Sequence, residues 1–233
     1  MENFWRYIDY YQCVLGIVAL VGIVGFTLLP SRHRRDSSII LSLAILVVVA
    51  AYEIMAAMLA SLKFPNFWVY NLFNSHLTAV LFMLLIRSFL KRKSHKNLVS
   101  LFIGLFLLIS LVLHLTGFVH YNDSGEYILF LNAVFILCSC GLYFFELITL
   151  DEYLEIDPLK EFSFGATTAI LFYFSSSFMI YISWQYLYTN HWDIYIMVKE
   201  IPRNMVLLCN LLLCFGVCSP ILKERLKLEI VHV

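Results

Sequence analysis

Seven long apolar segments, separated by short polar ones, fill this sequence from end to end. The apolar segments cover residues 8–29, 38–62, 67–90, 97–118, 124–149, 163–187 and 200–222. The hydrocarbon core of a bilayer is about 30 Å thick, and a helix needs about 20 apolar residues to cross it. The pattern therefore predicts an all-α, polytopic membrane bundle of seven transmembrane helices, forming one domain over residues 1–233.

Composition agrees with this prediction, because 61% of the residues are hydrophobic and only 14% are charged. A soluble domain carries about 25% charged residues. The formal net charge is +0, so no basic field favours a nucleic-acid partner. The first apolar segment is too long for the hydrophobic region of a signal peptide, and we expect it to remain as a helix.

The five prolines lie at or near the ends of the predicted segments. Proline removes a backbone donor and clashes with the preceding turn, so it is tolerated best where a helix starts or stops. We therefore expect continuous helices, with Pro202 in the first turn of the last one. Continuous helices argue against the broken helices of many ion-coupled transporters.

Lysine and arginine are distributed unequally between the two sides that the seven segments define. One side carries twelve of the sixteen: Arg32, Arg34, Arg35, Arg87, Lys91, Arg92, Lys93, Lys96, Lys160, Lys223, Arg225 and Lys227. Positive residues remain on the cytoplasmic side of a membrane. The pattern predicts a multi-pass protein of the cell inner (plasma) membrane with the N-terminus outside and the C-terminus cytoplasmic.

Polar side chains inside the predicted spans gather in their outer halves, whereas the inner halves are mainly aliphatic and aromatic. The candidate ligand-binding residues are Glu53, Asn71, Asn74, His76, Asn132 and Asn210. Glu53 is the strongest candidate, because a carboxylate at membrane depth needs a proton or a cation. Its depth matches that of His76, which leaves a Glu53–His76 pair open.

A polar stripe marks the third span, where Asn71, Asn74, Ser75 and Thr78 follow i, i+3, i+4, i+7 spacing. Such a stripe cannot face lipid cheaply, so we expect it to face a neighbouring helix or the bundle interior. Two interpretations stay open for the polar residues. They either hold the helices together through hydrogen bonds or line a pocket open to the outside.

Tyrosine and tryptophan crowd the predicted outer face, and Tyr11, Tyr70 and Tyr181 are among them. A belt at the membrane interface is the simpler interpretation. The alternative is that a minority of these rings line a cleft for an apolar or aromatic ligand.

Motifs for catalysis are missing from the sequence, which has no HExxH, no GxSxG and no glycine-rich phosphate loop. The six cysteines all fall within the predicted spans, so no disulfide framework is indicated. We therefore predict no catalytic residues, no metal site, no cofactor and no enzyme activity. An intramembrane lipid enzyme that uses Glu53 and His76 remains an alternative.

One resemblance lies in the second half of the chain. Its residues are Asp157-Pro158-Leu159, then Glu161-Phe162-Ser163-Phe164-Gly165, Tyr173-Phe174-Ser175-Ser176-Ser177, and Asn204 and Asn210 of the last span. This run resembles one in small uncharacterised bacterial seven-helix membrane proteins that often occur beside, or joined to, sensor histidine kinases. The resemblance implies sensory input at the membrane and a cytoplasmic signalling partner such as a histidine kinase.

These observations favour a receptor-like membrane module that relays an external or outer-leaflet cue to a cytoplasmic partner. A small transporter or channel, or a structural membrane subunit of a larger complex, is the alternative. The lipid bilayer is the one partner that the composition requires. Small residues at Gly16, Gly22, Gly25, Ala56 and Ala60 permit close helix contacts within one chain or between two copies, which leaves a homo-oligomer open.

Overall fold

The computed structural model describes residues 9–119, 126–150 and 161–231, without the side chains of residues 126, 184–185 and 222–231. All regular secondary structure in these ranges is helical. Seven of the helices are long and apolar enough to cross a membrane. The prediction of an all-α chain with seven candidate spans is therefore confirmed.

The first spans are α1 (Tyr10–Leu28) and α2 (Ser37–Ser61), joined through the short 3-10 helix η2 (His33–Arg35). The third span is one continuous rod of three parts, α3 (Phe67–Val69), the π-helix η3 (Tyr70–Thr78) and α4 (Ala79–Phe89). The remaining spans are α5 (Lys93–Leu115), α6 (Glu126–Thr149), α7 (Phe162–Asn190) and α8 (Trp192–Val231).

The last helix differs from its prediction. It begins at Trp192 and not near residue 200, so Pro202 and Pro220 both lie inside it. Internal proline is tolerated in membrane helices because neighbouring helices and local adjustments satisfy the backbone groups that it frees. The assumption that proline marks helix ends was therefore wrong here, and α8 is much longer than one membrane span requires.

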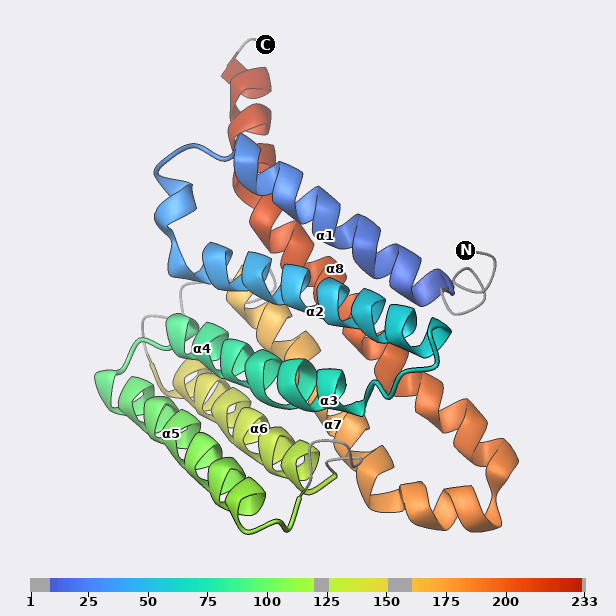
Figure 1. Ribbon diagram of the computed structural model, residues 1–233. Helices are drawn as coiled ribbons and strands as arrows, with labels where there is room; N and C mark the ends of the chain where they lie inside the picture. Colours follow the sequence, from blue (N-terminus) through green and yellow to red (C-terminus); the bar gives the residue numbers. More distant parts are fainter. Residues whose placement is uncertain (1–8, 120–125, 151–160, 232–233) are drawn as a thin grey trace.

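Four elements form the centre of the bundle, and the other helices pack against them: α2, the α3–η3–α4 rod, α7 and α8. Helix α8 contacts α1, α2 and α7, while the α3–η3–α4 rod contacts α2, α5, α6 and α7. Helices α1 and α5 lie at opposite edges of this arrangement (Figure 1). The outward faces of these two helices are apolar and exposed, with Leu20, Leu108 and Leu115 as examples. Such faces suit lipid contact, because hydrocarbon chains take the place of water there.

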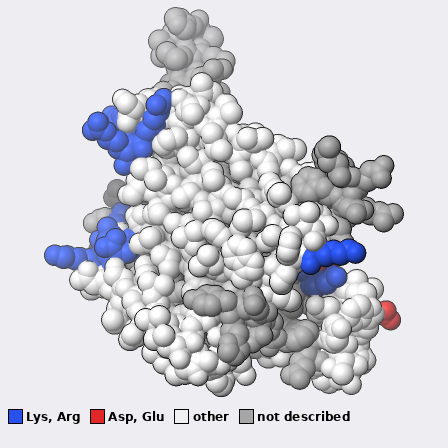
Figure 2. Space-filling view, in the orientation of Figure 1, with Lys and Arg blue, Asp and Glu red and all other residues white. Residues whose placement is uncertain are grey.

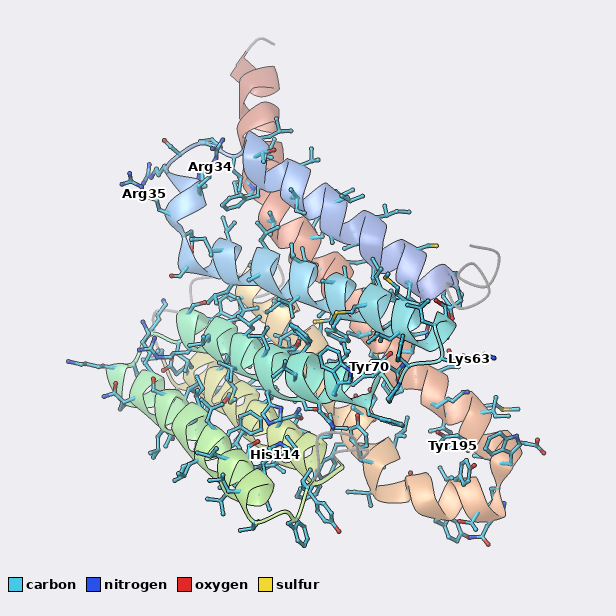
Figure 3. All side chains as sticks on the ribbon, in the orientation of Figure 1. Arg34, Arg35, Lys63, Tyr70, His114 and Tyr195 are labelled. Carbon is cyan, nitrogen blue, oxygen red and sulfur yellow. The ribbon has the colours of Figure 1, made fainter. Side chains whose placement is uncertain are left out.

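Charged residues lie at the two ends of the bundle, and a wide uncharged belt separates them on the face seen in Figure 2. Figure 3 shows Arg34 and Arg35 at one end, and Lys63 with Tyr70 at the other. We call the first the basic end and the second the Glu53 end. Arg34 secures the basic end, because its guanidinium donates to the carbonyl oxygens of Thr27 and Leu29.

Candidate functional site

Glu53 is a buried carboxylate held by two tyrosines. It lies on α2 with 8% of its surface exposed. The Tyr11 hydroxyl of α1 donates to Oε1 and the Tyr70 hydroxyl of η3 donates to Oε2, each at 3.3 Å. Within the described ranges, no lysine or arginine forms an ion pair with Glu53. Among the described residues, the hydrogen bonds to Glu53 thus come from neutral donors.

A cavity of about 340 Å³ opens beside Glu53. It is lined by residues of α1, α2, η3, α7 and α8: Tyr11, Gln12, Tyr52, Glu53, Tyr70, Asn74, Tyr173, Ser177, Tyr181, Pro202, Arg203 and Val206. This volume falls at the lower end of the range of small-molecule sites, about 300–1,000 Å³. Aromatic rings surround a few convergent polar groups, as in sites that bind small ligands.

An ion pair links α1 to α8 at the mouth of this cavity. Arg203 pairs with Asp9, and it also reaches Glu200 at 3.4 Å. Its guanidinium lies over the ring of Tyr11, 4.6 Å from the centroid. Asp9 also caps α1 by accepting from the Tyr11 amide. Partial burial raises the pKa of Asp9, but the hydrogen bond and charge of Arg203 outweigh it and hold that pKa below its ordinary value.

The π-helix η3 carries the polar stripe predicted for the third span. Two side chains of η3 form hydrogen bonds with the backbone five residues earlier. Ser75 Oγ donates to the Tyr70 carbonyl at 3.4 Å, and His76 Nδ1 donates to the Asn71 carbonyl at 2.5 Å. Asn71, Ser75 and Thr78 are buried, as the stripe predicts. π-Helical segments are rare and occur often at functional sites.

Two of the predicted residues line the Glu53 cavity, and a third adjoins it. Glu53 and Asn74 face this space directly, and Asn74 Oδ1 accepts from the Tyr52 hydroxyl at 3.2 Å. Asn132 lines a much smaller space of about 10 Å³ that shares Asn74 with the main cavity. Its side chain donates to the Ser75 carbonyl at 3.2 Å, which ties α6 to η3.

The other three predicted residues do not line the cavity. Asn71 contributes its carbonyl to His76, whose Nε2 lies 2.5 Å from Ser110 Oγ on α5. The carbonyl accepts only, so Nδ1 carries the proton and neutral Nε2 accepts from Ser110. His76 therefore faces α5, and the structure does not pair it with Glu53. Asn210 is buried on α8 and donates to the Val206 carbonyl at 2.7 Å.

The tyrosines of the cavity agree with the alternative interpretation of the outer aromatic residues, in which a minority of them line a cleft. An interfacial belt was the simpler interpretation for Tyr11 and Tyr70, yet both donate to Glu53. A signal for Tyr173 and Tyr181 existed on the sixth span, where Tyr173, Ser177 and Tyr181 follow i, i+4, i+8 spacing and form a polar stripe like that of η3.

A second buried carboxylate, Glu146, was also missed. It lies at the basic end of α6 and is fully buried. Its oxygens accept from the backbone amides of Lys91 and Arg92, at 2.7 and 3.0 Å, and from His95 Nδ1 at 2.8 Å. Ser42 of α2 and Thr167 of α7 are also buried in the inner halves of their spans, and Ser139 is buried on α6. Buried polarity is therefore not confined to the outer halves, contrary to the expectation from the sequence. Glu146 and Ser139 have hydrogen-bond partners inside the bundle, whereas the hydroxyls of Ser42 and Thr167 have none among the described residues.

Compared with family models, curated proteins and solved structures, the chain matches none of them. The resemblance to small bacterial seven-helix proteins thus stays a prediction. Fold and hydropathy define the class directly: this is an all-helical, multi-pass membrane protein. Within the described residues, no group of three His, Cys, Asp or Glu side chains is placed to hold a metal ion.

Proposed function

We propose that this protein is a seven-helix sensor module of the bacterial inner membrane. In this proposal a small external ligand occupies the Glu53 cavity, and the occupied state is passed to a cytoplasmic partner at the basic end. The observation that carries the proposal is the course of α8. This single helix contributes Arg203 and Val206 to the Glu53 cavity, and Gly216 and Ser219 to a second cleft at the basic end.

The second cleft has a volume of about 360 Å³ and lies among α2, α4, α7 and α8. Helix α7 also reaches both spaces, with Tyr173 at the first and Phe162 at the second. Beyond this cleft, α8 continues as a helix to Val231 and extends past the other helices (Figure 1). A displacement of α8 at the Glu53 cavity would therefore be carried to a surface that a partner can reach.

Aromatic side chains fill the bundle beside the Glu53 cavity. Phe82 and Phe174 are buried, and their rings lie 5.3 Å apart, centroid to centroid. Both pack against Tyr173, at 6.4 and 4.6 Å. Packed interiors transmit displacement well because they have few voids to absorb it. The packed aromatic interior therefore supports a relay of displacement rather than an open channel.

A small transporter is the second candidate, because two spaces at opposite ends with a packed layer between them also suit alternating access. Proteoliposomes separate the two functions. A proton-coupled transporter that uses Glu53 would acidify entrapped pyranine under an inward proton gradient, and the Glu53→Gln variant would not. The sensor proposal expects no difference between these two proteins.

The relay itself is tested by filling the cavity from α7 and measuring a response on α8. Ser177→Phe adds a ring to the cavity, whereas Met179→Phe adds the same ring to the lipid-facing side of α7, where Met179 is 67% exposed. The readout is the rate at which an impermeant maleimide labels Ser219→Cys in a Cys218→Ala background.

We expect Ser177→Phe to change this labelling rate several-fold and Met179→Phe to leave it unchanged. Val206→Trp, with lipid-facing Leu208→Trp as its control, repeats the test from α8. Equal labelling rates in all four variants, each verified as folded by its thermal transition, would overturn the relay.

A further inference from the structure

We infer that the ligand of the Glu53 cavity is a small organic ammonium ion with an apolar or aromatic body. The inference rests on the proposed ligand-binding function of this cavity and assigns a chemical class to its ligand. Three features carry it: an uncompensated buried carboxylate, an excess of negative charge at the mouth, and walls of tyrosine rings.

The first feature is the environment of Glu53. Among the described residues, the hydroxyls of Tyr11 and Tyr70 are the only donors to its two oxygens. A carboxylate withdrawn from water is costly unless a positive charge accompanies it. An ammonium group beside Glu53 supplies that charge and brings further hydrogen-bond donors. Because both carboxylate oxygens have room for more than one donor, the tyrosine bonds can stay in place when the ammonium binds.

The second feature is the charge around the cavity. Among the described residues of the lining, Arg203 is the one basic side chain, and it pairs with Asp9 and Glu200, which lie at the mouth and not in the lining. Counted over the described residues of lining and mouth together, Glu53, Asp9 and Glu200 are three carboxylates to the one guanidinium of Arg203. A narrow space with excess negative charge attracts cations and repels anions. A carboxylate or phosphate ligand would have to displace Asp9 from Arg203 to gain a partner.

The third feature is the aromatic lining. Tyr11, Tyr52, Tyr70, Tyr173 and Tyr181 all border the cavity. Rings of this kind attract cations through their negative faces, and groups of them bind organic ammonium ions. The cavity already shows such a contact, since the Arg203 guanidinium lies over Tyr11. The rings also provide apolar surface for the body of the ligand.

A bare metal ion fits these features less well. Calcium takes six to eight oxygen ligands and magnesium takes six, usually with carboxylates among them. Among the described residues that line the cavity, Glu53 is the one carboxylate. An organic ammonium ion needs one counter-charge and aromatic surface, and both are present.

The test compares three ligands that share a phenyl ring and differ in charge: 2-phenylethylammonium, neutral 2-phenylethanol and anionic 3-phenylpropionate. Binding is measured by calorimetry on the full chain in nanodiscs, with the thermal transition as a second readout. We expect measurable affinity for the ammonium ion and affinity weaker by about tenfold or more for the other two. Because this series uses the unaltered protein, it does not depend on whether a variant folds.

Glu53→Gln is the matching variant, and Glu161→Gln at the exposed start of α7 is its control. We expect the first to weaken ammonium binding by about tenfold or more and the second to leave it unchanged. Equal binding of the ammonium ion and the alcohol, preferred binding of the carboxylate, or unchanged affinity in Glu53→Gln would each overturn the inference.

The outcome is separable from that of the proposed function. If no ammonium ion binds but Ser177→Phe still changes the labelling of Ser219→Cys, the ligand class is wrong and the relay stands. If the ammonium ion binds through Glu53 but the labelling rate never changes, the cavity is a binding site without the proposed relay.

Discussion

At the scale of single residues, the two buried carboxylates, Glu146 and Glu53, differ in the hydrogen-bond donors that surround them. Glu146 is satisfied within the protein, since two backbone amides and a histidine ring surround it. Glu53 borders a cavity, and its only hydrogen-bond partners in the described part of the chain are two neutral hydroxyls at 3.3 Å. A carboxylate that lacks a protein counter-charge and faces an open space suits ligand binding, whereas one with three donors suits structure.

This difference predicts that Glu146→Gln destabilises the fold. The glutamine amide would put its own donors against the amides of Lys91 and Arg92, so at least one buried donor would lose its acceptor. We expect the free energy of unfolding to fall by about 2–3 kcal/mol. The measurement is reversible unfolding in mixed micelles.

Glu161→Gln is again the control, because Glu161 is exposed and its side chain makes no capping bond to α7. A change within about 0.5 kcal/mol is expected there. A stability loss as small as this in Glu146→Gln would show that the buried carboxylate does not hold the connection between α4 and α5.

The residue scale also shows what a sequence can reveal about the site. Glu53 was identifiable because a charge inside an apolar span is rare and costly. The roles of Tyr11 and Tyr70 could not be identified from the sequence. A tyrosine near the end of a span has the same sequence context whether it faces the lipid interface or a neighbouring helix. Only the packing of α1 and η3 against α2 directs these two hydroxyls to Glu53.

At the scale of helices, the spans were predictable because the thickness of the bilayer fixes their length and polarity. Two features of the helices could not be predicted from the sequence. The π-helical geometry of η3 leaves no mark in the pattern of apolar and polar residues, which is the same for an α-helix. The start of α8 was hidden by Pro202, which was expected in the first turn of the helix although the helix begins ten residues earlier, at Trp192.

The contact of α7 with α8 at the basic end gives the next prediction. Gly216 on α8 lies under the ring of Phe162 on α7, and a Cβ added there would lie 2.0 Å from Phe162 Cε2. We therefore expect Gly216→Ala to force the ring aside and to lower stability by about 1–3 kcal/mol. Thermal unfolding in nanodiscs measures the loss.

Two further variants make this prediction specific. Gly104→Ala on α5 is the control, because a Cβ at that position meets nothing within 4 Å and alanine favours a helix over glycine. Phe162→Ala in the Gly216→Ala background should recover part of the loss, since it removes the atoms that clash. Additive losses in the double variant would contradict a direct contact between these residues.

At the scale of the whole molecule, the direction of any signal depends on how the bundle is inserted. The Glu53 cavity and the cleft at Ser219 lie at opposite ends of the bundle, where α8 contributes Arg203 and Val206 to the first and Gly216 and Ser219 to the second. The connections at the basic end carry Arg34, Arg35, Lys91 and Arg92, whereas Lys63 lies at the Glu53 end (Figure 3). This asymmetry predicts that the Glu53 cavity opens outside the cell and that α8 ends in the cytoplasm.

Reporter fusions test this orientation in living cells. We expect green fluorescent protein at the C-terminus to fluoresce and alkaline phosphatase at the same position to be inactive. Alkaline phosphatase inserted after the exposed Lys63 should be active, because that connection then lies in the periplasm. The opposite result at both positions would put the cavity in the cytoplasm. The ammonium ligand would then be a cytoplasmic compound and the signal would run outward, so the fusions decide which side of the membrane this protein senses.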